Sequence, residues 1–116
     1  MIVITGGAGF IGSSLAENIP TEELLIIDVF NDNNHKKYLN KITNARLVNL
    51  KNCRPILNYF KKNISYFYHL GANSSTDQSK LSETVEFNIF WSQYFWDFCS
   101  KNKIPFMYAS SAATYG

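Results

Sequence analysis

The sequence has few of the features that mark secreted, membrane or metal-binding proteins. It has only two cysteines, Cys53 and Cys99, and neither lies at metal-ligand spacing from a second candidate ligand. We therefore expect two reduced thiols, no metal site and a cytoplasmic location. No apolar run approaches the ~18 residues that cross a bilayer. The N-terminal MIVITGG lacks the basic region and the apolar length of a signal peptide.

Neither positive nor negative residues are in large excess. The net charge is +2 at pH 7, too small to favour nucleic acid or a membrane surface as a partner. The 116 residues are 46% hydrophobic and 17% charged, which fits one globular domain at most.

Short apolar runs alternate with stretches of helical periodicity along the chain. We expect strands at 2–5, 24–28, 45–49, 64–70 and 104–109, and helices at 11–19, 55–62 and 81–102. Pro20 is expected to end the first helix. This alternation predicts an α/β fold with a parallel sheet. Because the strands are apolar on both faces, we expect them to lie between two layers of helices.

The stretch TGGAGFIG follows the first expected strand and opens the first helix. Gly6 permits a tight turn, Gly9 lets the backbone approach a pyrophosphate, and Gly12 permits close packing of helix on strand. The backbone N–H groups of Phe10 and Ile11 would point at the phosphates, assisted by the helix dipole. The alternative interpretation is a plain strand-to-helix turn.

An acid ends the second expected strand. Asp28 lies 22 residues after Gly6, where a carboxylate accepts a hydrogen bond from an adenosine ribose. A carboxylate there favours NAD over NADP, because it would repel a 2′-phosphate. Lys36 and Lys37 in the next loop would reverse that preference by pairing with the phosphate. An acid without a ligand and two solvated lysines are the alternatives.

Three motifs together resemble the extended short-chain dehydrogenase/reductase superfamily, the NAD-dependent sugar-nucleotide epimerases and dehydratases. They are TGGAGFIG, HLGANSST at 69–76 and ASSAATYG at 109–116. The last two are most similar to the versions in ADP-L-glycero-D-manno-heptose 6-epimerases, whereas UDP-sugar 4-epimerases more often have valine before the tyrosine. The resemblance covers all 116 residues. It implies a Rossmann-type doubly wound parallel sheet, truncated after its fifth strand, as the N-terminal part of a dinucleotide-binding domain whose C-terminal substrate domain lies outside the chain.

The resemblance also implies site residues. Cofactor contacts are expected from Gly6, Gly9, Phe10, Ile11, Gly12, Asp28, Val29, Lys37, Leu70, Gly71, Ala72, Asn73, Ser74 and Asn88, and a catalytic contact from Ser111. Lys37 would contact the 2′-phosphate of NADP, and Asn88 would face the dinucleotide from the last helix. Ser111 would hydrogen-bond the reacting hydroxyl or carbonyl. The family often has an acid where this chain has Leu70, and a polar residue where it has Val29, so NADP or NAD stays open.

The implied reaction epimerises C6 of an ADP-heptose through a transient 6-keto sugar, for lipopolysaccharide core precursor synthesis. The superfamily's base is the tyrosine of a Tyr-x-x-x-Lys motif, whose lysine lowers the tyrosine pKa. None of the seven tyrosines here has a lysine four residues later. We therefore expect that motif beyond Gly116, an inactive 116-residue chain, and a homo-oligomer when complete. The alternatives are a UDP-hexose 4-epimerase or a related dehydratase, and a non-catalytic dinucleotide-binding module.

The last expected helix is apolar on two sides, so we expect it to be buried on both. The side expected to face the sheet holds Val85, Asn88, Ile89, Ser92 and Trp96, and a second stripe holds Phe87, Trp91, Tyr94 and Phe98. His69 ends an expected strand and is interpreted as a packed histidine rather than a base.

Overall fold

Five parallel strands form a single sheet in the computed structural model, which describes residues 1–6, 10–19, 22–29, 42–70 and 81–108. The strand order is β3-β2-β1-β4-β5. The strands are β1 (Ile2–Thr5), β2 (Leu24–Asp28), β3 (Ala45–Asn49), β4 (Tyr66–His69) and β5 (Phe106–Tyr108). The helices are α1 (Phe10–Glu17), α2 (Cys53–Phe60) and α3 (Leu81–Lys101), with a 3₁₀ turn η2 (Leu50–Asn52) before α2. The predicted doubly wound α/β fold is confirmed.

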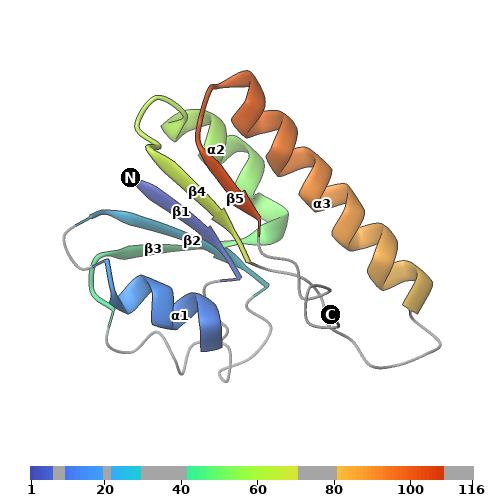
Figure 1. The fold of residues 1–116 in the computed structure, drawn as a ribbon, viewed down its shortest axis with the longest axis horizontal. Helices are drawn as coiled ribbons and strands as arrows, with labels where there is room; N and C mark the ends of the chain where they lie inside the picture. The colour runs from blue at the N-terminus through green and yellow to red at the C-terminus, as the bar shows by residue number, and fades with distance from the viewer. Residues whose placement is uncertain (7–9, 20–21, 30–41, 71–80, 109–116) are drawn as a thin grey trace.

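Helices cover both faces of the sheet, α1 on one and α2 and α3 on the other (Figure 1). Successive side chains of β1 therefore enter two separate cores. Val3 packs in the core under α2 and α3, and Ile4 packs in the core under α1. Both residues are fully buried, as expected for a strand with a helical layer on each side. None of the described helices has the length and apolarity needed to cross a bilayer.

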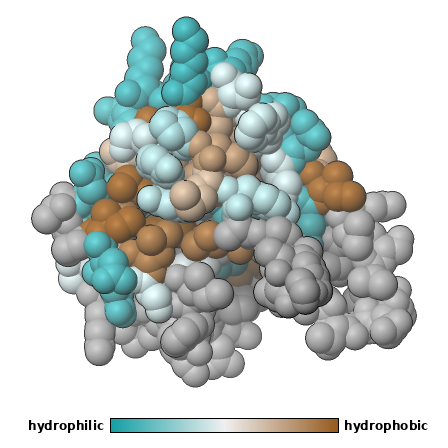
Figure 2. Space-filling model, viewed as in Figure 1, coloured by the Kyte–Doolittle hydropathy of each residue, from teal (hydrophilic) through white to brown (hydrophobic). Residues whose placement is uncertain are grey.

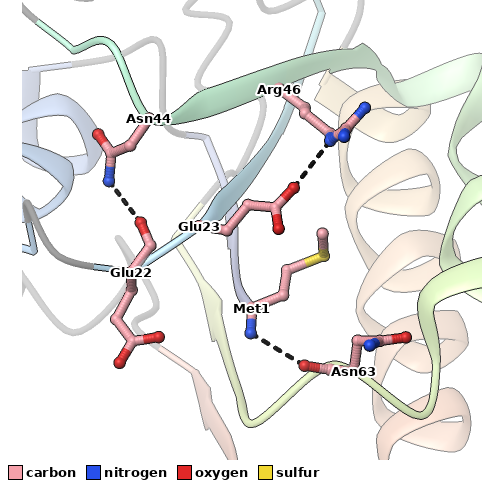
Figure 3. A network of polar contacts seen from close by, with 6 residues as sticks. All are labelled: Met1, Glu22, Glu23, Asn44, Arg46 and Asn63. Atoms are coloured by element: carbon pink, nitrogen blue, oxygen red, sulfur yellow. Dashed lines mark hydrogen bonds and ion pairs between the residues drawn. The ribbon is translucent and has the colours of Figure 1, made fainter.

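Polar contacts join the segments that enter the strands (Figure 3). Arg46 Nε donates to Glu23 Oε1 at 2.9 Å, between β3 and the residue before β2. The Met1 ammonium donates to the Asn63 carbonyl at 2.9 Å, between the starts of β1 and β4. These contacts are exposed and contribute little stability. They lie at the amino ends of the strands. In open α/β sheets, ligands bind beyond the opposite, carboxyl ends of the strands.

Two elements differ from the expected boundaries. Helix α2 begins at Cys53, two residues before the predicted start at Pro55. Proline is tolerated in the first helical turn because the N–H it lacks has no partner there. Strand β5 leaves Met107 and Tyr108 about half exposed, because it pairs with β4 alone and lies at an edge of the sheet.

The predicted sheet-facing side of α3 is wrong for Ile89 and Trp96, although Ser92 on that side does contact His69 of β4. Phe95 and Cys99 are 1% exposed and face the core, whereas Ile89 is 62% exposed and Trp96 is 54% exposed. The small Cys99 side chain lets the helix lie close to the sheet, and the Phe95 ring packs 5.1 Å from the ring of Phe67 in β4. Burial raises the pKa of the Cys99 thiol to about 12, so that group is protonated and serves as a core residue.

Candidate functional site

The site suggested by the strand order lies at the carboxyl edge, between β1 and β4. From β1 the chain proceeds through β2 to β3 on one side, then returns to β4 on the other. In parallel sheets with helices on both faces, this reversal opens a crevice beyond the strand ends, where ligands bind. Thr5 and His69 are the last residues of β1 and β4 and lie opposite each other in the sheet.

The turn after β1 has the backbone that a close ligand contact needs. Gly6 has a φ of 75°, a left-handed conformation that costs a residue with a Cβ free energy. Its N–H donates to the Ile27 carbonyl at 2.8 Å, which fixes the turn against the end of β2. Helix α1 begins at Phe10, and Gly12 in its first turn is buried, where a larger side chain would meet neighbouring atoms. This combination fits a pyrophosphate at a helix N-terminus.

Asp28 lies at the same edge, at the end of the neighbouring strand. Its Oδ1 accepts a hydrogen bond from the Val29 N–H at 2.7 Å, which orients the carboxylate. Asp28 and Val29 are both half-buried. A carboxylate held at the end of β2, one strand from the glycine turn, suits a ribose hydroxyl.

His69 is buried at the end of β4, beside the end of β1. It is 3% exposed, and its two ring nitrogens contact two hydroxyls: Nδ1 lies 2.6 Å from Thr5 Oγ1, and Nε2 lies 2.9 Å from Ser92 Oγ. Burial lowers the His69 pKa to about 4, so the ring is neutral near pH 7. The centre of the Phe95 ring lies 5.1 Å from the centre of the His69 ring. The interpretation of His69 as a packed histidine is therefore confirmed.

An open groove of about 480 Å³ runs between α3 and β5 beside this histidine. Its lining residues are Asn88, Ile89, Ser92, Gln93, Trp96, Phe106 and Tyr108. Asn88, Ser92 and Gln93 of α3 contribute amide and hydroxyl groups to the lining, and both elements contribute aromatic residues. In the space-filling view, the most hydrophobic residues of the face shown lie mainly to the left of its centre, with hydrophilic residues along the top (Figure 2).

The structure brings together part of the predicted site. Gly6, Asp28 and Leu70 meet at the carboxyl edge, and the Leu70 N–H donates to the Thr5 carbonyl at 3.1 Å. Phe10 and Ile11 are the first two residues of α1, and Asn88 lies in α3. Gly12 lies in the first turn of α1, and Val29 follows Asp28. Seven predicted residues lie outside the described residues: Gly9, Lys37, Gly71, Ala72, Asn73, Ser74 and Ser111.

Two residues near the site were not among the predicted site residues. Thr5 and Ser92 are the hydrogen-bonding partners of His69. The signal for Thr5 was its position at the end of a strand, beside another strand that ends in histidine. The signal for Ser92 was its spacing of four residues from Asn88, which places both on one side of a helix.

The sequence of residues 2–116 matches the family described as NAD dependent epimerase/dehydratase. The chain belongs to this family. Among curated relatives, the ADP-L-glycero-D-manno-heptose-6-epimerase of Fusobacterium nucleatum is 30% identical over 125 residues. That match covers 100% of this chain and 36% of the relative, so the chain spans about a third of the relative's length.

Solved structures of epimerases share the fold. The UDP-N-acetylglucosamine 4-epimerase of Methanobrevibacter ruminantium, in complex with UDP-N-acetylmuramic acid, is 28% identical with a TM-score of 0.76. It is matched over 99% of this chain and 39% of its own. The Helicobacter pylori ADP-L-glycero-D-manno-heptose-6-epimerase is 27% identical with a TM-score of 0.66, over 99% of this chain and 40% of its own. This NAD dependent epimerase/dehydratase chain is thus similar to enzymes with two different sugar-nucleotide substrates.

Proposed function

We propose that the protein supplies the dinucleotide-binding part of a sugar-nucleotide epimerase, with residues 1–116 as the N-terminal part of a Rossmann domain. The observation that carries the proposal is the pairing of the left-handed Gly6 turn with Asp28 at the end of the adjacent strand. A plain strand-to-helix turn needs neither feature. Membership of an NAD dependent family supports the same proposal.

The chain's own residues would hold the cofactor in a defined order along the carboxyl edge. The Gly6 turn and the start of α1 would hold the pyrophosphate, and Asp28 with Val29 would hold the adenosine ribose. Leu70 and Asn88 would lie along the nicotinamide half. When bound, the nicotinamide supplies reversible oxidation at a sugar carbon, and the protein supplies binding and orientation.

We propose ADP-heptose as the substrate, with epimerisation at C6. The GANSST and ASSAATYG motifs and the 30% identity to a heptose epimerase support this proposal. The reaction needs a base for the hydroxyl proton, and the 116 residues contain no Tyr-x-x-x-Lys to provide it. In this proposal the base and the sugar-binding residues come from outside the 116 residues, and the complete protein forms homo-oligomers in the cytoplasm.

A UDP-hexose 4-epimerase is the second candidate. The observation that favours it is the higher TM-score to the 4-epimerase than to the heptose epimerase, 0.76 against 0.66. Assays of the complete gene product on ADP-heptose and on UDP-hexoses separate the two. Turnover of ADP-heptose alone is expected, and turnover of UDP-hexoses alone would show that the substrate proposal is wrong.

Cofactor binding is tested by titrating the complete gene product with NADP and NAD and measuring heat or nicotinamide fluorescence. We expect at least one of them to bind with a micromolar or lower Kd. Asp28→Asn is expected to change the affinities, and Asp97→Asn, which alters an exposed carboxylate on α3, serves as the matched control. If neither dinucleotide binds, the glycine turn has another role.

A further inference from the structure

We propose that His69 is a positioning residue that joins the glycine turn after β1 to helix α3 and thereby sets the place of Asn88 at the cofactor. This inference rests on the proposed dinucleotide-binding function. It assigns a role in cofactor affinity to Thr5, His69 and Ser92, none of which is expected to touch the cofactor.

The first connection runs along the sheet edge. Thr5 directly precedes Gly6, and its Oγ1 lies 2.6 Å from His69 Nδ1, across the β1–β4 pairing where Thr5 and His69 face each other. The Leu70 N–H donates to the Thr5 carbonyl at 3.1 Å, so side chain and backbone both join the two strand ends. The position of the Gly6 turn relative to β4 is therefore coupled to the His69 ring.

The second connection runs from the sheet to the helix. His69 Nε2 lies 2.9 Å from Ser92 Oγ, on the side of α3 that borders the groove. Asn88 lies four residues earlier, about one helical turn away on the same side, and lines the same groove. A bond at Ser92 fixes the rotation of α3 about its axis, and that rotation decides where the Asn88 amide lies.

The surroundings hold the ring in one orientation. The Phe95 ring lies 5.1 Å from the imidazole edge-on, and the Tyr108 ring stacks on it at 5.3 Å. A neutral imidazole has one donor and one acceptor nitrogen, and hydroxyls can take either role, so both bonds form together in either tautomer. A phenylalanine at this position would fill the space but would make neither bond.

The opposing interpretation is that His69 only fills the core. The two interpretations differ in cofactor affinity, because lost packing would lower the free energy of unfolding without changing binding by the folded protein. The decisive change is Ser92→Ala, which removes the second bond and leaves the ring in place. Ser100→Ala, at an exposed position on the same helix, is the matched control.

The experiment measures the Kd for NADP and NAD of the complete gene product and of four variants. Ser92→Ala is expected to weaken binding about tenfold, the effect of one partly buried hydrogen bond, and Ser100→Ala to leave it unchanged. Asn88→Ala is expected to weaken binding similarly. The double variant Ser92→Ala/Asn88→Ala is expected to bind no more weakly than Asn88→Ala alone, because Ser92 acts through Asn88.

Histidine variants give a second, independent readout. Gln places an amide near the Nε2 position and should retain the bond to Ser92, whereas Asn reaches only the Nδ1 position. His69→Gln is therefore expected to bind cofactor more tightly than His69→Asn. Unchanged affinity in Ser92→Ala, or additive losses with Asn88→Ala, would overturn the positioning role while the proposed function stands. If the unaltered protein binds neither dinucleotide, both proposals fail.

Discussion

The guanidinium carbon of Arg54 in α2 lies 5.0 Å from the centre of the Tyr94 ring in α3. The rings of Phe90 and Trp91 lie at 5.1 and 5.5 Å from the same carbon, so one cation faces three aromatic side chains of the neighbouring helix. This arrangement joins the two helices that cover one face of the sheet. Contacts of this kind at exposed positions contribute about 0.5–1 kcal/mol.

Arg54→Met is therefore expected to lower the free energy of unfolding by about 1 kcal/mol, because methionine retains part of the aliphatic packing but has no charge. Urea denaturation followed by circular dichroism measures the change. Lys62→Met, which removes an exposed cation just after α2, is the control and should change stability little. Equal effects of the two substitutions would show that the cation–ring contacts contribute nothing.

The stability of the protein is expected to fall in mild acid because of His69. Burial lowers its pKa to about 4 from 6.5, so between these values the unfolded chain binds a proton that the folded chain does not. The free energy of unfolding should therefore decrease as pH falls from 6.5 towards 4, and His69 should contribute up to about 3 kcal/mol of this decrease. Above pH 6.5, His69 should make no pH-dependent contribution, because it is neutral in both the folded and the unfolded chain. Denaturation curves at pH 7, 5.5 and 4.5 measure this, and the slope should be smaller in His69→Gln. Parallel pH profiles for the two proteins would contradict the expectation.

Asp28 is expected to set the preference between NAD and NADP. Asparagine keeps an oxygen that can accept the Val29 N–H and removes the charge that repels a 2′-phosphate. Asp28→Asn should therefore shift the ratio of the two affinities about tenfold towards NADP, which corresponds to about 1.4 kcal/mol. Parallel titrations of both cofactors measure the ratio. An unchanged ratio would mean that the carboxylate does not reach the ribose.

Lys37 is expected to act in the opposite direction, by pairing with the 2′-phosphate. Lys37→Ala should weaken NADP binding about tenfold and leave NAD binding unchanged, because only NADP has that phosphate. Lys36→Ala is the natural control, since it removes the same charge one residue earlier. If Lys36→Ala has the larger effect, the neighbouring lysine makes the contact.

The 116-residue chain alone is expected to show no epimerase turnover on ADP-heptose. The reason is chemical: the reaction needs a positioned base, and no tyrosine here has a lysine four residues later. Product analysis by chromatography after incubation with NADP or NAD tests this, with the complete gene product as the positive control. Robust turnover by residues 1–116 would require a different base.

The sequence predicted the sheet well, because its strands are short apolar runs bounded by glycine, proline and polar residues. It predicted Asp28 at the end of β2 and Gly6 after β1, since both follow from the end of a buried run. It did not predict which side of α3 faces the sheet. Trp96 and Phe95 are both large and apolar, and it is the packing of Phe95 against Phe67 and His69 of β4 that distinguishes them.

The same limit applies to the candidate site. The contact of His69 with Ser92 joins residues 23 apart in the chain, and its geometry depends on how α3 lies across the sheet. Periodicity gives the side of a helix on which a residue lies. It does not give the angle between helix and strand that brings a hydroxyl within 2.9 Å of a ring nitrogen.

The central position of β1 has a consequence for synthesis on the ribosome. β1 is the first strand made, yet it pairs with β2 on one side and with β4, Tyr66–His69, on the other. Its second edge therefore stays unpaired until about sixty more residues have been translated, and such long-range pairings form slowly. During that interval the nascent chain exposes the apolar side chains and the unpaired backbone groups of β1. Depletion of chaperones should therefore increase aggregation of nascent chains that end between β2 and β4.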